Sequence, residues 1–527
     1  MRPQAILVDQ RFEKSAEQFE TIKLHLCSNE ALGLSHSELE RTLYRQGMEL
    51  LRRLMQDHLK LRAVQEQEQG LDRPVVGVDQ VERTHRRAGD VGLMTSFGPV
   101  RVERLSYGQP GVESLKPLEG QLNGPQDSYS HEVRRRVALE VARGSYDDSL
   151  EAIDHNTGAH VPKRQAQELT KRAAQDFDEF YQRRAVPERP LGTAGELVVL
   201  SADGKGVVMR PEALLPAVRR AAARPEHKMR KRLSKGEKKD RKRMSTVAAV
   251  YTVEPYVRTA EDILAELAPV HLVAQQEQER PRPQDKRVWA SVVKKPELLI
   301  REAFEEGLRR DPDRQRTWVA LSDGNKPQLK LFKKLAKEYG IELTVILDII
   351  HVVQYLWKAT TVFNGEGTPE AEQWVEQRFL EVLRGRASHV AAGIRRSATK
   401  RGLKPEQRKA ADKCAGYLLK YAQYMRYADY LDQGFPIATG VIEGGCRYLV
   451  KDRMDITGAR WGLEGAEAVL RIRALRASGD FDDYWAFHEA CEYERNHIER
   501  YAAKEVPQLR LPSSRRRSYR SHLRLVD

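Results

Sequence analysis

The amino-acid sequence predicts an α/β fold, in which an α/β domain carries an all-helical insertion and follows helical and small β-rich modules. Three observations predict it. Short apolar runs alternate with amphipathic helical patterns over residues 190–365, residues 366–435 are charged and free of strand-like runs, and residues 436–480 return to the first pattern. We therefore treat 190–365 and 436–480 as one domain that the helical segment interrupts.

The charge balance indicates a polyanionic partner. The chain has 90 Lys and Arg against 76 Asp and Glu, a formal net charge of +14. Each Lys or Arg that faces a phosphate releases condensed counterions, so a nucleic acid is the partner we expect. The alternative is a protein that is merely soluble and basic.

The cysteines and the hydropathy exclude several classes of protein. Cys27, Cys414, Cys446 and Cys491 lie far apart and form no CxxC pair. This fits a reducing compartment and argues against a disulfide framework or a cysteine zinc site. The N-terminus does not have the pattern of a cleaved leader, and no apolar run approaches the length of a membrane span. We expect a cytoplasmic protein with no membrane partner.

The first two modules differ in their periodicity. Residues 1–70 are expected to be helical, because overlapping capping boxes at Ser35 and Ser37 precede leucines at near-helical spacing. A solvated helical hairpin and a dimerisation helix both fit this segment. Residues 75–125 form a small β-rich module, in which we expect short strands separated by Gly-containing turns at Val81–Arg86, Gly92–Pro99 and Val100–Leu105.

Residues 129–185 are helical again and could form a helix-turn-helix. Asn156-Thr157-Gly158 marks a turn, and the helix expected at Val161–Tyr181 opens with Lys163 and Arg164. Such residues reach phosphates and base edges, so this helix is a candidate DNA-reading helix. A helical hairpin with an ordinary polar face explains the same residues.

The α/β domain is defined by four apolar runs and the helices between them. The expected helices are Pro296–Arg309 and Pro327–Tyr339, with a last helix at Glu464–Ala477. The expected strands are Leu197–Ala202, Ser245–Val253, Thr317–Leu321 and Leu343–Leu347. Residues 481–527 form a C-terminal helix and a basic tail, whose arginines are Arg515, Arg516, Arg517, Arg520 and Arg524.

Two of these strands end in nearly the same way. The runs that end in Ala202 and Ser322 are followed by Asp203-Gly204 and Asp323-Gly324. An Asp at the end of an apolar strand lies at the edge of the sheet, and the following Gly lets the chain turn away and lets a ligand approach the backbone. The alternative is that Asp-Gly is simply a favourable turn, which explains one occurrence more easily than two.

A third acidic residue, Glu443, lies in an uncharged, glycine-containing stretch just after the helical insertion. Phosphoryl transfer with two metal ions needs hard oxygen ligands, and Mg²⁺ prefers carboxylates. We expect Asp203, Asp323 and Glu443 to bind two Mg²⁺ ions, for which Mn²⁺ can substitute. The cations that follow on the next turns, Arg447, Lys451 and Arg453, could hold a DNA backbone beside the metals.

The two intervals between these acidic residues are 120 residues each, and each contains an insertion. The first insertion, Arg210–Arg243, is rich in positive charge, and we describe it as a solvated loop whose sign and position favour contact with DNA. Its candidate DNA-binding residues are Arg230, Lys231, Arg232, Lys238, Lys239, Arg241, Lys242 and Arg243. The second insertion is the helical stretch described above.

At these residues the sequence resembles a known group. The blocks SADGKGVVMR, ALSDGNKPQ, ILDIIHVVQYLWKA and TGVIEGGCRYLVKDRMDITGARWGLEGAEAVLRIRAL are similar to those of ISKra-type insertion-sequence transposases, within the Mutator-like DDE transposases. The resemblance covers roughly Val75 to Ala477. It implies a ribonuclease-H-like domain with a helical insertion, catalytic metal ligands at Asp203, Asp323 and Glu443, and cleavage and strand transfer on double-stranded DNA at transposon ends and targets. It also implies a homodimer or larger synaptic assembly and a bacterial, nucleoid-associated protein.

Two further features follow from the resemblance. Asp348-x-x-His351 matches a motif after the second catalytic Asp, so His351 is a candidate catalytic residue at the scissile phosphate; the alternative is a capping Asp348 with a packing His351. Trp461 could stack on a flipped base or pack in the core. The chain departs from relatives that carry a zinc ribbon, because residues 75–108 contain no cysteine.

Three rival functions remain at this point. A structure-selective nuclease could use the same fold without strand transfer. A domesticated, non-catalytic DNA-binding protein could descend from a transposase, although all three acidic residues are intact. A helix-turn-helix regulator would leave the long α/β domain without a purpose.

Overall fold

The structure is a computed structural model that describes residues 11–184, 197–223, 241–266 and 280–510. The chain divides into two compact units. Unit 1 contains Met1–Phe180 and Asp482–Asp527, and unit 2 contains Tyr181–Phe481. The first and last parts of the chain therefore fold together.

Unit 1 begins with three helices, as the leucine spacing predicts. They are α2 (Glu13–Leu26), α3 (Asn29–Leu32) and α4 (His36–Gln69). The capping box expected at Ser35 forms, with the Glu38 carboxylate accepting from the Ser35 N–H at 2.9 Å. Gly70 ends α4 with a positive φ of 68°, which glycine adopts without a side-chain clash.

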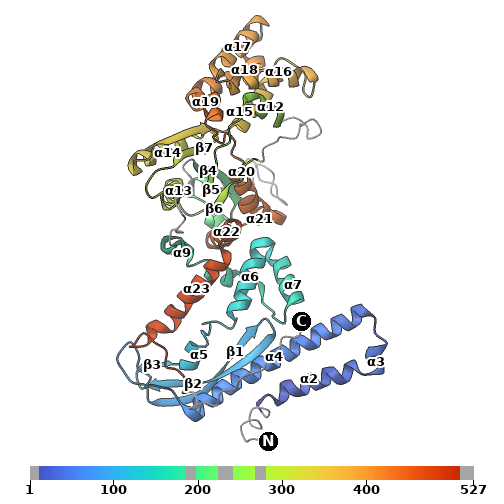
Figure 1. Ribbon diagram of the computed structural model, residues 1–527, viewed down its shortest axis with the longest axis vertical. Coiled ribbons are helices and arrows are strands. Elements are labelled where there is room, and N and C mark those ends of the chain that lie inside the picture. Colours follow the sequence, from blue (N-terminus) through green and yellow to red (C-terminus); the bar gives the residue numbers. More distant parts are fainter. Residues whose placement is uncertain (1–10, 185–196, 224–240, 267–279, 511–527) are drawn as a thin grey trace. The chain divides into compact units, whose positions relative to one another are not determined.

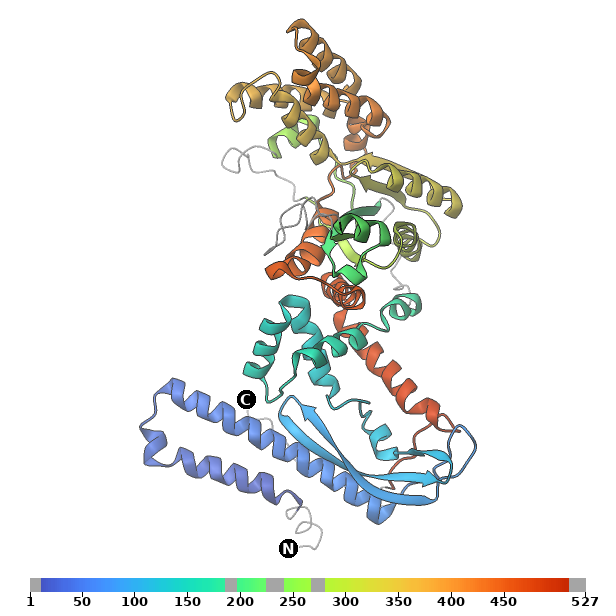
Figure 2. The same cartoon turned by 180° about the vertical axis from the view of Figure 1, so that it is seen from behind.

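The β-rich module is an antiparallel sheet of β1 (His85–Thr95), β2 (Gly98–Gln109) and β3 (Val112–Leu115). It runs alongside α4 (Figures 1 and 2). The expected strand at Gly92–Pro99 is wrong, because that segment contains the β1–β2 turn. Thr95 pairs with Gly98, whose φ is +121°, whereas Gly89 and Gly92 are paired inside β1 rather than forming turns.

Five helices complete the N-terminal part of the chain up to residue 183. The single helix expected at Val161–Tyr181 is divided, because α8 ends at Ala173 and a new helix starts at Phe177. The helices are α5 (Pro117–Gln121), α6 (His131–Arg143), α7 (Tyr146–Asn156), α8 (Lys163–Ala173) and α9 (Phe177–Arg183).

The C-terminal segment of unit 1 packs into these helices through α23 (Phe481–Asn496). The Arg134 guanidinium donates to the Glu492 carboxylate at 3.0 Å, and His488 Nδ1 lies 2.6 Å from the Asp176 carboxylate. A backbone bridge joins Leu71 to Leu509. Loss of one partner of a buried ion pair strongly destabilises a folded protein. These contacts therefore make the C-terminal segment part of the core of unit 1.

Unit 2 is built on a five-stranded mixed sheet with the strand order β6-β5-β4-β7-β8. The first three strands pair antiparallel, and β7 and β8 are parallel to β4. The strands are β4 (Leu197–Val208), β5 (Lys242–Val253), β6 (Gln284–Ser291), β7 (Thr317–Ser322) and β8 (Leu343–Leu347). The mixed α/β class expected from the sequence is confirmed.

Two features of this sheet differ from the expectation. No apolar run marks the whole of β6 in the sequence, because its first half is polar and charged. Arg287 is buried there because it pairs with Glu306 at 2.6 Å. In addition, β4 does not end at Ala202. It continues through Asp203 to Val208, because β5 pairs with it along that whole length.

Helices lie on both faces of the sheet. Side chains alternate between the faces of a strand, so Trp318 and Asp323 lie on opposite faces. Gly307 of α13 (Pro296–Arg310) contacts Trp318, whereas Gly445 of α20 (Gly440–Gly445) approaches Val247, the residue paired with Asp203. The face that carries Asp203 is therefore the one that α20 covers.

The helical insertion is confirmed between α15 (Ile349–Thr360) and α20. Its helices (orange in Figure 1) are α16 (Pro369–Leu383), α17 (Ala387–Lys400), α18 (Pro405–Tyr421), the short η4 (Ala422–Tyr424) and α19 (Tyr427–Asp432). After α20 the chain forms a π-helical turn, η5 (Cys446–Lys451), the short α21 (Asp452–Met454) and η6 (Ile456–Gly458), and then α22 (Leu463–Ser478) on β6.

Other helices of unit 2 are α10 (Pro216–Ala222), α12 (Ala260–Glu266) and α14 (Lys326–Tyr339). Among the described residues, no helix has both the length and the apolar character needed to cross a membrane.

Candidate carboxylate site at the strand ends

Asp203 and Asp323 lie at the same level on neighbouring parallel strands. The pairing of β4 with β7 runs from Leu197↔Thr317 to Ser201↔Leu321. Two residues further along each strand, the same register aligns Asp203 with Asp323, and both side chains are on the same face. The matched apolar runs of the sequence thus bring the two aspartates together.

The next strand adds a third aspartate at this level. β7 pairs with β8 up to Ser322↔Leu347, so Asp348 follows β8 as Asp323 follows β7. The Asp348 N–H donates to the Ser322 carbonyl at 2.8 Å, which extends the pairing beyond the strand. Three aspartates therefore line the carboxyl-terminal side of three adjacent parallel strands.

Asp203 is held by two contacts inside the protein. One carboxylate oxygen accepts from the Gly204 N–H at 2.6 Å, and the other lies 3.3 Å from the Cys446 Sγ, whose thiol donates to it. The chain does not turn away after Gly204, contrary to the expectation. Asp203 is instead accessible at the sheet edge because β7 ends at Ser322 while β4 continues.

Asp323 lies in a true turn. Gly324 has a φ of +91°, and the Asn325 N–H donates to the Asp323 carboxylate at 2.8 Å before α14 begins. A side chain at Gly324 would be strained and would also meet Leu347 and Tyr421 at 3.0 and 3.4 Å. Glycine is therefore required here for both its conformation and its size.

Tyrosines of the insertion fix the backbone around these aspartates. The Tyr417, Tyr421 and Tyr427 hydroxyls donate to the carbonyls of Asp323, Gly324 and Leu347 at 3.3, 2.6 and 2.8 Å. Tyr417 also stacks on Tyr355 of α15, with ring centroids 3.9 Å apart. The insertion thus forms one wall of the site.

Asp348 and His351 form a pair on α15, as the spacing predicts. His351 Nδ1 lies 2.7 Å from one Asp348 oxygen, and the other oxygen accepts from the Ile350 and Thr439 N–H groups at 3.2 Å. Asp348 is fully buried and His351 is partly exposed. Asp348 therefore both caps the helix and orients His351.

Glu443 reaches the site on α20, and a close helix–sheet contact sets its position. A Cβ at Gly445 would lie 2.9 Å from Val288 and 3.5 Å from Val247, so only glycine permits this approach. Cys446 follows on the π-helical turn, a feature frequent at functional sites. No donor among the described residues bonds to the exposed Glu443 carboxylate, which leaves it free to bind a ligand.

The electrostatics of these groups show that they share one environment. Burial raises the pKa of Asp323 above its usual value, and the negative charges of Asp203 and Asp348 raise it further, against the Asn325 hydrogen bond and the nearby His351. Partial burial, Asp348 and Asp203 likewise raise the pKa of Glu443, while His351 opposes this. Asp203 thus acts on both of the other predicted ligands.

Two other groups respond to the same charges. The hydrogen bond to Asp348 raises the pKa of His351, and Asp323 and Glu443 add to the effect. Burial, followed by Asp203, raises the pKa of the Cys446 thiol well above its usual range. The thiol therefore remains protonated as a donor to Asp203.

The donor set suits a hard divalent cation. Ligand atoms of Asp348, His351 and Glu443 all lie within 4.8 Å of one another. Among the described residues the predicted set Asp203, Asp323 and Glu443 does not converge within this distance. Asp203 and Asp323 offer further carboxylate oxygens, which Mg²⁺ and Mn²⁺ prefer, outside that group. Burial, and to a lesser extent repulsion among these carboxylates, raises the pKa values of Asp323 and Glu443, and a bound cation would favour their ionised forms.

The predicted DNA-binding residues are distributed unevenly. Lys163 pairs with Asp147 at 2.7 Å at the surface of unit 1, and Arg164 is exposed beside it. In unit 2, the Arg243 side chain donates to the Val292 carbonyl at 2.6 Å, and Arg241 and Lys242 are partly exposed at the start of β5. Arg230, Lys231, Arg232, Lys238, Lys239 and the tail arginines lie outside the described residues.

The cations after Glu443 divide into two groups. Arg447 and Lys451 are exposed, and Arg447 lies 3.8 Å from Asp452. Arg453 is only 2% exposed and lies over the Trp461 ring, whose indole N–H donates to the Met454 carbonyl at 3.0 Å. The expectation of a surface Arg453 is wrong, because its guanidinium is buried on Trp461; Trp461 itself packs in the core.

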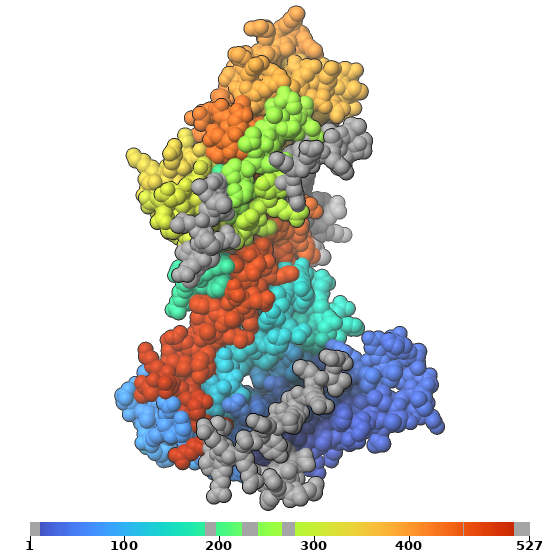
Figure 3. All heavy atoms as spheres, in the orientation of Figure 1, coloured from blue at the N-terminus to red at the C-terminus, as the bar shows by residue number. Residues whose placement is uncertain are grey.

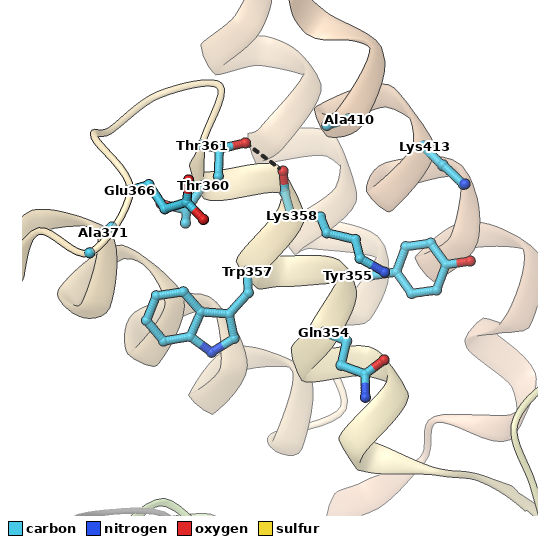
Figure 4. Close-up of a pocket in the computed structure, with 11 residues that line it drawn as sticks. Gln354, Tyr355, Trp357, Lys358, Thr360, Thr361, Glu366, Ala371, Ala410 and Lys413 are labelled. Atoms are coloured by element: carbon cyan, nitrogen blue, oxygen red, sulfur yellow. Dashed lines mark hydrogen bonds between the residues drawn. The ribbon is translucent and has the colours of Figure 1, made fainter. Parts of the chain in front are cut away.

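A separate hollow of about 620 Å³ lies between α15 and the insertion helices α16 and α18 (Figure 4). Trp357 and Tyr355 lie on different sides of α15 there, and Lys358 extends toward the Tyr355 ring at 5.6 Å. The lining includes no carboxylate of the strand-end site. The two are therefore distinct, although α15 contributes to both.

Five residues of the site were not predicted from the sequence in these roles: Asp348 as one of its carboxylates, Cys446, and the tyrosines Tyr417, Tyr421 and Tyr427. Asp348 ends an apolar run just as Asp323 does, so its place among the carboxylates was readable from the sequence. Cys446 and the three tyrosines carried no such signal, because their contacts depend on how α20 and the insertion pack. Neither protein-family models nor curated proteins gave a match to this chain.

Proposed function

We propose that this chain is a DDE-type DNA transposase of the ISKra-type, Mutator-like group, which cleaves DNA strands at transposon ends and joins them to a target. The observation that carries the proposal is the strand register that aligns Asp203 with Asp323, with ligand atoms of Glu443, Asp348 and His351 within 4.8 Å of one another beside them. The strand order, three antiparallel strands followed by two parallel ones, supports a ribonuclease-H-like domain.

The acidic residues present suit a divalent cation, and the proposal takes two. Asp203, Asp323 and Glu443 would hold them. Asp348 and His351 lie close enough to Glu443 for either residue to share in binding one cation. When bound, Mg²⁺ or Mn²⁺ would supply Lewis acidity and charge neutralisation at the scissile phosphate.

The chain's own residues contribute positioning and proton handling. The Cys446 thiol and the Gly204 N–H orient the Asp203 carboxylate, and the tyrosine hydroxyls fix the Asp323 turn. Asp348 holds His351 with one ring nitrogen engaged, which leaves Nε2 to donate to or accept from a phosphate oxygen or leaving group. Both DNA ends must be held at once, so an assembly of two or more copies is part of the proposal.

The experiment is metal-dependent cleavage and joining of DNA that carries the sequences flanking this gene. Asp203→Asn, Asp323→Asn and Glu443→Gln should each lower cleavage by at least about a thousandfold with DNA binding retained, because each removes a charge the cations need. Asp432→Asn, at an exposed position of the insertion, is the matched control. Wild-type rates in all three site variants, or cleavage unaffected by EDTA, would refute the proposal.

The products separate the proposal from its nearest rival. A transposase yields 3′-ends joined to target DNA, whereas a structure-selective nuclease on the same fold yields cut ends alone. DNA binding without any processing in Mg²⁺ or Mn²⁺ would instead indicate a domesticated, non-catalytic protein.

A further inference from the structure

Four lysines form a stripe along α14. Lys326, Lys330, Lys333 and Lys337 are spaced four, three and four residues apart, so they share one narrow face of the helix. All four are exposed. The other side of the helix buries Leu329, Phe332, Leu335 and Ala336 against unit 2, so the lysine face points to solvent. α14 lies at the surface of unit 2 (yellow in Figure 3).

The lysines of this stripe have no acidic partners in the part of the chain that the structure describes. Among the described residues, none of the four forms an ion pair, whereas Lys334 on the same helix pairs with Glu297 at 2.6 Å. Like charges three and four residues apart destabilise a helix. A row of uncompensated lysines therefore lowers stability unless a polyanion lies along it.

The stripe begins beside the carboxylate site. Lys326 follows Asp323 by three residues, after the Gly324 turn and the Asn325 cap. From Lys326 to Lys337 the helix rises about 16 Å, which corresponds to about five base-pair steps of a duplex. A polyanion on the stripe would thus lead directly to Asp323.

The far end of the stripe opens into a hollow of about 490 Å³ beside the edge strand β8. Lys333, Lys337 and Arg426 line it together with one acid, Glu342. Lys333 lies 4.9 Å from the centre of the Tyr424 ring, which holds the ammonium group in place. The positive charge therefore continues onto the insertion through Arg426, which lies 3.9 Å from Asp429.

We infer that the lysine stripe of α14 is a binding track for the phosphate backbone of duplex DNA, leading away from the carboxylate site. The inference rests on the proposed function for the identity of the polyanion. It assigns DNA contact to residues outside the basic segments that the sequence singles out, which are Lys163 and Arg164, Arg230–Arg243, the cations after Glu443 and the C-terminal tail.

The test is the salt dependence of DNA affinity, measured on the full-length protein by fluorescence anisotropy in EDTA, so that no cleavage occurs. Each Lys→Gln substitution in the stripe should reduce the slope of log K against log salt by about 0.9, and the quadruple variant by about 3 to 4, because each contact displaces condensed counterions. Lys334→Gln, on the same helix, should leave the slope unchanged. Thermal melting of each variant confirms that it is folded.

An unchanged slope in the quadruple variant overturns the inference. So does a larger change on duplex RNA than on DNA, or lysine-dependent binding of polyglutamate with no change on DNA, which would identify an acidic protein as the partner. Cleavage in Mg²⁺ is scored separately on the same proteins. If the unsubstituted protein cleaves DNA and the slope of the quadruple variant is unchanged, the track alone is refuted. If the slope of the quadruple variant is reduced and the unsubstituted protein does not cleave, the proposed function alone is refuted.

Discussion

The Tyr421 hydroxyl donates a 2.6 Å hydrogen bond to the carbonyl of Gly324, the residue that follows Asp323. The two residues are 97 positions apart in the sequence. Lys420 in turn donates to the same hydroxyl at 2.5 Å, which polarises it as a donor. The geometry of the second aspartate thus depends on a helix of the insertion.

Removing this hydroxyl should weaken the site without unfolding the protein. We expect Tyr421→Phe to lower cleavage about five- to tenfold, since one hydrogen bond contributes about 1 kcal/mol. The half-saturating Mg²⁺ concentration should rise while DNA affinity stays constant. Tyr424→Phe is the control, because its hydroxyl makes no hydrogen bond among the described residues. Equal losses in both variants would assign the effect to general packing.

The contact at Gly445 gives a second prediction. Gly445→Ala places a Cβ 2.9 Å from Val288, so α20 must shift from the sheet and take Glu443 and Cys446 with it. We expect a loss of about 1 to 3 kcal/mol in the free energy of unfolding and at least a tenfold loss of cleavage. Circular dichroism melts and cleavage rates measure the two effects.

Gly440→Ala is the matched control on the same helix, since nothing lies within 4 Å of an added Cβ there. It should leave cleavage unchanged and slightly stabilise the helix. Val288→Ala should partly rescue Gly445→Ala by giving the new methyl group room. Failure of that rescue would show that the close approach is not the cause.

Buried Glu66 of α4 predicts a pH dependence of stability. Burial raises the pKa of Glu66 to about 6, against the hydrogen bond from the Leu105 N–H. Between pH 4.5 and 6 the folded chain binds the proton that the unfolded chain releases. Glu66 therefore makes its full contribution to the free energy of unfolding at low pH. About 2 kcal/mol of that contribution is lost as the pH rises through 6.

Glu66→Gln should remove this dependence, because the amide oxygen can still accept from Leu105. We expect unit 1 to be stabilised by roughly 1 to 2 kcal/mol at pH 8 and hardly changed at pH 4. Hydrogen exchange of the Leu105 amide reports on this site directly. Equal effects of the substitution at both pH values would contradict the raised pKa.

The cysteines should differ sharply in reactivity. Cys27 is exposed, whereas Cys414, Cys446 and Cys491 are buried, and burial raises the pKa of Cys414 to about 12. Because only the thiolate attacks, one thiol per native chain should react rapidly with Ellman's reagent at pH 8, and all four in guanidinium. Rapid labelling of Cys446 in the native protein would show that α20 opens from the sheet.

The sequence predicts much of this site because its signals are local. The runs before Asp203 and Asp323 are apolar and equally placed, so parallel pairing aligns the two residues. Asp348 and His351 meet because residues three apart share a helical face. These relationships need only strand and helix periodicity.

The remainder depends on partners far along the chain. β4 continues past Asp203 because β5, about 40 residues later, supplies pairing that Asp203-Gly204 alone does not predict. Arg287 lies in a buried strand only because Glu306 neutralises it. From its local sequence Arg453 is likewise expected at the surface, but its guanidinium lies over the Trp461 ring. In each case a tertiary partner overrides the local preference.

The chain order of the two units has a consequence for biosynthesis. Unit 1 needs Glu492, His488 and Leu509 to complete its core, yet these residues leave the ribosome about 300 residues after Phe180. At elongation rates of about 5 to 20 residues per second this interval lasts roughly 15 to 60 s. The N-terminal helices and hairpin must remain incomplete throughout that time, while unit 2 can fold as soon as it emerges. In a nascent chain truncated before α23, chaperones and proteases should therefore act on the N-terminal part of unit 1 and not on unit 2.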